Sequence, residues 1–150
     1  MISVEDPRTI RRPCPLLRRQ FCHIQHHSQN GVHPGIRFTV LSGDGDNCRF
    51  RQEVKLVGML QADEIVQRRN PDGSLSWDIV EGANKGTHID QSFSPLSPDA
   101  TTVTVRATAP ATGIKLVLKP LFAFAIRKAV EKGLEEDRLD LEERGYGSER

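Results

Sequence analysis

The stretch that most constrains this chain is Pro120–Tyr146, the one long amphipathic helical pattern in the sequence. It follows a series of short alternating apolar runs separated by turn residues, a pattern typical of strands. An amphipathic helix buries its apolar stripe against another element, and strands joined by short turns form an antiparallel sheet. The order therefore predicts an α+β chain whose sheet packs on a C-terminal helix that begins at Pro120 and ends near Arg144.

Length and charge place further bounds on the chain. Its 150 residues predict a single domain over 1–150. A formal net charge of +1 gives no general attraction to nucleic acid, and no apolar run is long enough to predict a membrane span. Cys14, Cys22 and Cys48 form an odd set without C-x-x-C spacing, which disfavours a disulfide framework and a structural zinc site. Reduced thiols predict a cytoplasmic protein.

Alternation of apolar and polar residues predicts the strands. They are a short strand within Met1–Pro13, interrupted at Pro7, then Gly35–Leu41, Cys48–Leu60, Ala62–Arg69, Leu75–Ile79, Thr87–Phe93 and Thr101–Ala109. Gly58, inside the long second of these runs, predicts a bulge or bend. Helical spacing predicts one short helix over Pro15–His27 and a separate helical turn within Gly113–Lys119. The expected architecture is a curved antiparallel sheet of about six to seven strands wrapped around the long helix, with one or two short helices near the N-terminus.

Three local patterns accompany this order of elements. Gly82–Gly86 precedes a strand that ends in Phe93-Ser94-Pro95, Asp99–Val103 opens the next strand, and Leu118–Phe122 leads into the charged helix. Together with the element order, they resemble the helix-grip fold of the START-like superfamily, also called SRPBCC, which includes birch-pollen-allergen-like and polyketide cyclase-like proteins. The resemblance spans nearly the whole chain, and it implies a space between the sheet and the C-terminal helix.

The superfamily spans carriers, cyclases and oxygenase domains, so the resemblance implies a ligand class rather than a reaction. Our first hypothesis is binding of a hydrophobic small molecule, of lipid, polyketide or aromatic type, between the sheet and the helix, as in lipid transport. This hypothesis requires no cofactor, and it allows for a homodimer. The expected lining residues are the apolar side chains Phe38, Phe50, Trp77, Phe93, Phe122 and Ile126.

A histidine cluster and one aspartate support a second hypothesis. His23, His26, His27 and His33 lie within one short segment, and the helical phase places Asp137 within the apolar stripe of the last helix. A carboxylate there needs a partner if it is buried, or it lies past the sheet edge in water. Two histidines and one carboxylate form the facial triad that binds non-haem iron.

The same segments are similar to the catalytic domains of Rieske-type ring-hydroxylating oxygenases. Glu136-Asp137-Arg138 with Glu142 resembles the sequence around their aspartate, and His27…His33-Pro34 resembles their histidine segment. The resemblance implies iron held by His27, His33 and Asp137 in an oxygenase-like or cyclase-like enzyme. His27 and His33 enclose one residue more than in that family, and the sequence has no Rieske cluster motif. The alternative is that the histidines cap or decorate a solvated helix end.

The third hypothesis concerns the basic start of the chain. Its arginines are Arg8, Arg11, Arg12, Arg18 and Arg19. They indicate either a solvated surface or a patch for a partner. In the second case the chain is a protein-interaction module without an open cavity.

Overall fold

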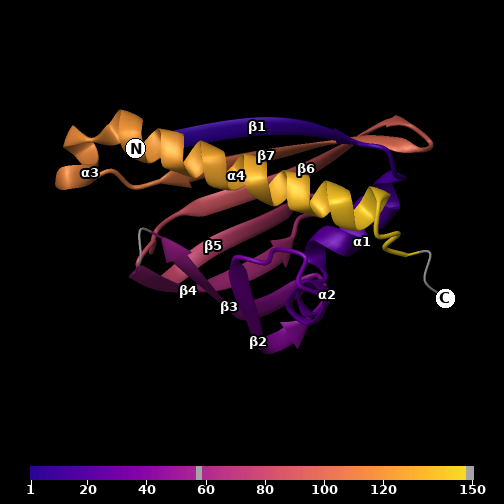
Figure 1. The fold of residues 1–150 in the computed structure, drawn as a ribbon, viewed down its shortest axis with the longest axis horizontal. Coiled ribbons are helices and arrows are strands. Elements are labelled where there is room, and N and C mark those ends of the chain that lie inside the picture. Colours follow the sequence, from indigo (N-terminus) through magenta and orange to yellow (C-terminus); the bar gives the residue numbers. More distant parts are fainter. Residues whose placement is uncertain (57–58, 148–150) are drawn as a thin grey trace.

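A computed structural model describes residues 1–56 and 59–147 of the chain. The strands are β1 (Ile2–Ile10), β2 (Ile36–Asp44), β3 (Asn47–Leu56), β4 (Met59–Arg69), β5 (Leu75–Gly82), β6 (His88–Ser97) and β7 (Ala100–Ala109). The helices are α1 (Cys14–Cys22), α2 (Ile24–Asn30), α3 (Ile114–Val117) and α4 (Lys119–Glu142). The described strands form one antiparallel sheet in the order β1-β7-β6-β5-β4-β3-β2. The sheet curves around α4 (Figure 1), which confirms the predicted α+β helix-grip architecture.

Two strand predictions were wrong, for different reasons. β1 runs through Pro7 without interruption, because β1 is an edge strand whose outer side needs no ladder hydrogen bond from Pro7. The predicted strand Cys48–Leu60 is two strands, since β3 and β4 pair antiparallel with Leu56 opposite Met59. Alternation continues on both sides of the reversal and therefore conceals it. The bulge predicted at Gly58 lies outside the described residues.

The predicted single helix Pro15–His27 is broken at His23. The backbone of His23 has φ −85° and ψ 72°, outside the helical region, so α1 ends and α2 begins there. Helical spacing of apolar residues persists across the break, which is why periodicity alone did not reveal it. The change of direction matters for function, because it decides which histidines of α2 point into the molecule.

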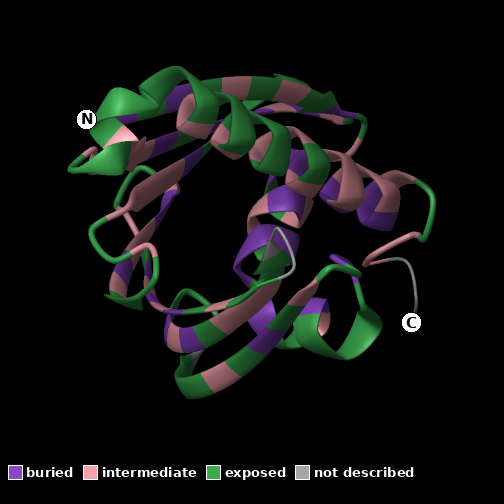
Figure 2. Ribbon diagram, turned by 60° about the vertical axis from the view of Figure 1, so that its left-hand side comes forward, coloured by how far each residue is buried: buried purple, intermediate pink, exposed green. Residues whose placement is uncertain are grey.

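α1 and the end of α4 meet in the larger of two hydrophobic clusters. That cluster includes Leu17, Phe21, Phe93, Leu134 and Leu141, with neighbours from β5 and β7. A second cluster joins α2 to β2, β3, β4 and β5. The buried residues of α4 all lie in its C-terminal part, from Leu134 onward. Figure 2 shows the rest of the helix as exposed or half-buried. The buried side chains of α4 are therefore confined to its C-terminal part, although Arg127 in the earlier part donates to the carbonyl oxygen of Glu5 in β1 over 3.2 Å.

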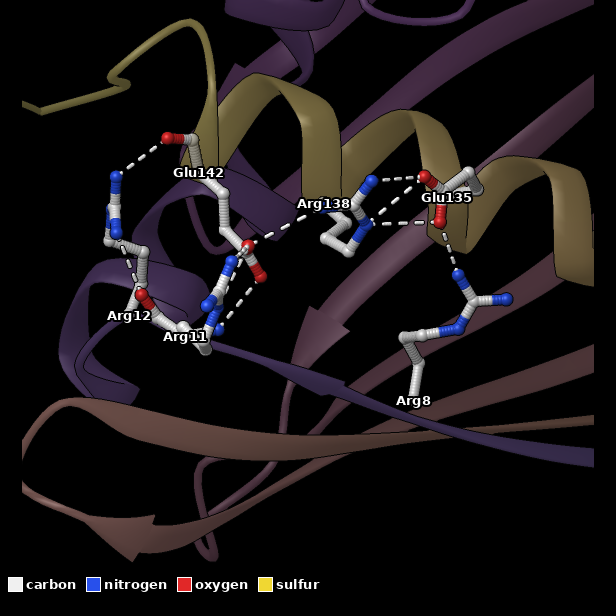
Figure 3. Close-up of polar contacts among 6 residues, drawn as sticks. All are labelled: Arg8, Arg11, Arg12, Glu135, Arg138 and Glu142. Carbon is white, nitrogen blue, oxygen red and sulfur yellow. Dashed lines mark hydrogen bonds and ion pairs between the residues drawn. The ribbon is translucent and has the colours of Figure 1, made fainter.

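The arginines near the N-terminus pair with α4 (Figure 3). Arg8 binds Glu135, and the backbone N–H of Arg11 donates to Glu142 Oε2 over 2.9 Å. Arg12 donates from Nη2 to the carbonyl oxygen of Glu142 over 2.7 Å. These contacts fix the end of α4 beside the end of β1. Arg8 and Arg12 are half-buried in these contacts, whereas the Arg11 side chain stays 81% exposed, so the choice between a solvated surface and a partner patch stays a prediction.

Glu142 is the best-enclosed acid in this group. Burial alone would raise the pKa of Glu142, but the hydrogen bonds from Arg11 hold that pKa below its ordinary value. Among residues 1–56 and 59–147, none of the helices combines the length and the apolar composition that a bilayer crossing demands.

Candidate functional site

Three buried polar side chains converge between α2 and α4. They are His27 from α2, His33 from the segment after α2, and Asp137 from α4. Each offers one potential ligand atom, and these atoms all lie within 4.8 Å of one another. The predicted inward position of Asp137 is confirmed, because only 6% of this residue is exposed. The helix end and the histidine segment are thus brought together across more than a hundred residues of chain.

His27 holds one ring nitrogen in a hydrogen bond and leaves the other without one. Nε2 lies 2.8 Å from the carbonyl oxygen of Gln20, which can only accept, so Nε2 carries the proton. Nδ1 is buried without a hydrogen-bond partner among the described residues, and lies 3.7 Å from Asp137 Oδ1. Burial lowers the pKa of His27, and it outweighs the attraction of Asp137. The neutral ring therefore presents a lone pair on Nδ1 toward the carboxylate.

His33 is in the opposite charge state. Its Nδ1 lies 3.0 Å from Glu136 Oε1 and its Nε2 lies 3.2 Å from Asp137 Oδ1. Burial lowers the pKa of His33, but the charge of Asp137 and the hydrogen bonds to both carboxylates raise it to about 9. The His33 imidazolium stacks on the His27 ring, with centroids 5.2 Å apart and planes at 3°. Gly31, in the left-handed conformation at φ 56°, turns the chain from α2 toward His33.

Asp137 has donors on two sides. Gln20 donates from Nε2 to Asp137 Oδ1 over 3.2 Å and to Asp140 Oδ2 over 2.9 Å. Burial would raise the pKa of Asp137, but the His33 charge and these hydrogen bonds hold it below the ordinary range. Of the two outcomes considered for this carboxylate, the structure shows the buried one with partners. His26 extends the network, because its Nε2 lies 2.8 Å from Asp140 Oδ2.

Gln20 and Glu136 were missed by the sequence reasoning. Gln20 is fully buried, and it lies on the stripe of α1 that also carries Leu17. A polar residue on an apolar stripe was a usable signal. Glu136 gave no such signal, because its neighbours Glu135 and Asp137 are also acidic and only the three-dimensional position of His33 distinguishes it.

The other two histidines of the cluster, His23 and His26, face a surface pocket. This pocket has a volume of about 500 Å³ and is lined by Arg19, Cys22, His23, His26, Asn30, Gly45, Tyr146 and Gly147. His23 Nδ1 lies 3.0 Å from the Tyr146 hydroxyl. The four histidines therefore divide into two pairs. The surface interpretation holds for His23, which is exposed, and is wrong for His27 and His33.

Comparison with solved structures shows the fold that carries this site. TTHA0849 from Thermus thermophilus matches with a TM-score of 0.80 and 16% identity, over 91% of this chain and 94% of that one. A START superfamily protein from Mycobacterium smegmatis matches with a TM-score of 0.77 and 14% identity, over 95% and 98%. The chain has the START-like helix-grip fold. The Zhui aromatase/cyclase from a Streptomyces strain matches with a TM-score of 0.74 and 14% identity, over 95% and 97%. No protein-family model matches the sequence, and a search of curated proteins found no relative.

Three of the aromatic residues predicted to line the helix-grip interior form a continuous row. The centroid of the Phe50 ring lies 5.8 Å from that of the Phe38 ring and 5.2 Å from that of the Trp77 ring. The Phe38 ring also lies edge-on to both histidine rings of the site, with its centroid 6.1 Å from that of His27 and 5.9 Å from that of His33. The polar site and the aromatic row are therefore neighbours inside one grip.

The other predicted lining residues lie apart from this row. Phe93 packs on Phe21 in the larger core cluster, with ring centroids 5.3 Å apart. Phe122 and Ile126 are half-buried on the first half of α4. Whether these residues touch a ligand stays a prediction.

Proposed function

We propose that this helix-grip chain binds a hydrophobic small molecule, of lipid, polyketide or aromatic type, between the sheet and α4. One observation carries the proposal. Phe122, Ile126, Val130 and Leu134 form one stripe of α4, but only Leu134 is buried. A stripe that is apolar throughout and closed at one end only leaves room for an apolar ligand at the other. The similarity to a START superfamily protein and an aromatase/cyclase supports this ligand class.

The aromatic row gives the proposal a direct reporter. Trp77 is the sole tryptophan of the chain and is half-buried at the end of the row. Titration with fatty acids and with polycyclic aromatics should change Trp77 fluorescence in a saturable way, at one ligand per chain. Ile126→Asp places a charge on the open stripe and should weaken binding at least about tenfold, because an unpaired charge is costly beside an apolar ligand.

Leu96→Asp is the matched control, since Leu96 is 63% exposed and lies at the far end of β6. It should bind the ligand as the unaltered chain does. No saturable signal with either ligand class, or equal binding by Ile126→Asp, would overturn the proposal.

A second candidate function rests on the buried polar site. We propose that His27, His33 and Asp137 hold a non-haem ferrous iron in an oxygenase-like or cyclase-like enzyme. The unpartnered Nδ1 of His27 is the observation that favours it, because a buried lone pair without a donor is costly unless a ligand uses it. When bound, iron with this ligand set supplies redox chemistry with dioxygen. Glu136 would then accept from His33 Nδ1 and orient that ring.

Metal analysis separates this candidate from a purely structural ion pair. The protein is dialysed anaerobically against ferrous iron, and bound iron is measured per chain. We expect about one iron in the unaltered chain and a large loss of iron in His27→Gln. His23→Gln is the control, because His23 is exposed, lies 3.0 Å from the Tyr146 hydroxyl and lines the surface pocket. Substoichiometric iron in the unaltered chain, or equal iron in His27→Gln, would exclude the metal function.

We also propose a cytoplasmic location. Cys14 and Cys22 are buried free thiols, which suits a reducing compartment.

A further inference from the structure

α3 and the first turns of α4 present a run of apolar side chains to solvent. Ile114, Leu116, Val117, Leu121 and Phe124 are all exposed, Val117 at 78% and Phe124 at 56%. We call these five residues the α3–α4 apolar surface. α3 buries none of its residues, so packing within the chain does not account for its composition. Five exposed apolar residues within positions 114–124 are an unusual concentration that indicates an interaction site.

A second exposed apolar group lies at the same end of the molecule. Met59 and Leu60 begin β4 and are both largely exposed. Figure 1 places the start of β4 and α3 at the same end, opposite the turn between β6 and β7. This is also the end at which the stripe of α4 stays open. Exposed apolar residues thus occur at this end of the molecule both on the sheet and on the helical segment.

The charges among these residues have one sign. Lys115, Lys119, Arg127 and Lys128 lie within or beside the α3–α4 apolar surface, and Glu131 pairs with Lys128 over 3.6 Å. No acidic residue occurs from Ala100 to Val130, so Lys115, Lys119 and Arg127 carry the local positive charge. The net charge of the whole chain is only +1, so the positive charge is concentrated locally. This surface suits an anionic partner.

The basic side chains lie over apolar ones rather than on a separate face. Lys128 Nζ is 5.4 Å from the centroid of the exposed Phe124 ring, and Lys115 Nζ is 5.7 Å from that of Phe122. Apolar residues with adjacent cations are the composition of segments that lie in the interface of a bilayer. The apolar groups enter the acyl boundary while the cations stay at the headgroups.

We propose that the α3–α4 apolar surface, with Met59 and Leu60, docks on a bilayer that contains anionic lipids. A second copy of the chain fits less well, because pairing two such surfaces would bring Lys115, Lys119 and Arg127 of one copy against the same cations of the other. Docking would place the open end of the grip against the membrane. The proposal stands on exposed residues alone and holds whether or not a ligand occupies the interior.

Vesicle co-sedimentation of the full chain tests the docking. Vesicles of phosphatidylcholine with about one-third phosphatidylserine should bind the protein, and vesicles of phosphatidylcholine alone should bind it weakly. Val117→Asp should lower the affinity at least about tenfold. The substitution removes apolar groups that would be buried in the bilayer, and the anionic lipids repel the new carboxylate. Lys119→Gln should lower it about fivefold, and added salt should weaken binding further.

Two substitutions serve as matched controls. Leu96→Asp adds the same charge at an equally exposed apolar residue, at the opposite end of the molecule. Arg51→Gln removes an exposed cation from β3. Both should leave vesicle binding within about twofold. All four positions are exposed, so the thermal midpoint should not change.

Two results would overturn the docking. One is vesicle binding that is absent or unchanged in Val117→Asp. The other is a concentration-dependent dimer in light scattering that Val117→Asp dissociates, because the surface would then be an interface between copies.

Discussion

At the scale of single residues, the site is organised by the opposite charge states of two stacked histidines. His27 is neutral because burial lowers its pKa, whereas His33 is charged because two carboxylates raise its pKa to about 9. The His33 proton and a divalent metal would occupy the same position, since both bind at Nε2 beside Asp137. Metal uptake at neutral pH should therefore release a proton from His33.

The first residue-scale prediction concerns pH. The folded pKa of His33, about 9, exceeds its unfolded value of 6.5. Its contribution to stability is therefore complete below pH 6.5 and is lost as pH rises through 9, by up to about 3 kcal/mol. Urea unfolding from pH 6 to pH 10 should show this decline in the apo protein and a flatter profile in His33→Gln.

His23→Gln is the control for that measurement. Burial lowers the pKa of His23, so this ring is neutral in both states throughout the alkaline range and its removal should not change the slope. A His33→Gln profile that declines as steeply as the unaltered one would show that His33 is not charged in the fold.

The second residue-scale prediction concerns Gln20. Its Nε2 is a shared donor to Asp137 and Asp140. Gln20→Met keeps the volume but removes that donor, and should lower the free energy of unfolding by about 2–3 kcal/mol at pH 7. Gln25→Met, on an exposed position of α2, should change it by less than about 0.5 kcal/mol. Equal effects of the two substitutions in chemical denaturation would contradict the role of Gln20.

At the scale of elements, the periodic patterns of the sequence predicted the strands and the long helix, but not the breaks that these patterns run across. Alternation located the strands, and the phase of α4 placed Asp137 inside. The break at His23 and the reversal between Leu56 and Met59 were missed, because apolar periodicity continues across both. His27 and His33 were selected together from residue type and spacing. Their stacking depends on the change of direction after α1, which no local pattern reports.

The uneven anchoring of α4 gives an element-scale prediction. Leu141 is fully buried, whereas Leu121 is largely exposed. Leu141→Ala should lower the free energy of unfolding by about 2–4 kcal/mol, and Leu121→Ala should lower it by less than about 0.5 kcal/mol. Urea unfolding of both variants provides the measurement. A comparable loss in Leu121→Ala would mean that the first half of α4 is packed in solution.

At the scale of the whole molecule, the buried polar site, the aromatic row and the apolar stripe of α4 are linked through shared residues or a shared helix. The buried polar site touches the aromatic row through Phe38. That row leads to Trp77, and the open stripe of α4 belongs to the same helix as Asp137. Asp137 follows Val130 by seven residues, about 10 Å along the helix axis, so a ligand on the stripe would have to extend toward the C-terminal end of α4 to reach the polar site. The proposed ligand binding and the proposed iron site use different residues, so the experiments on iron and on ligand can succeed independently.

Ligand binding should then change the dynamics of one defined segment. Residues 119–133, the part of α4 before Leu134, include no buried side chain, so their amide groups should exchange with deuterium quickly in the free protein. A hydrophobic ligand bridging this half-helix to the sheet should slow that exchange. At about 100 times its Kd, it should also stabilise the fold by about 2.7 kcal/mol. Ile126→Asp should show neither effect. If protection instead appears around Tyr146 and His23, the ligand occupies the surface pocket, and the open stripe of α4 is not its binding site.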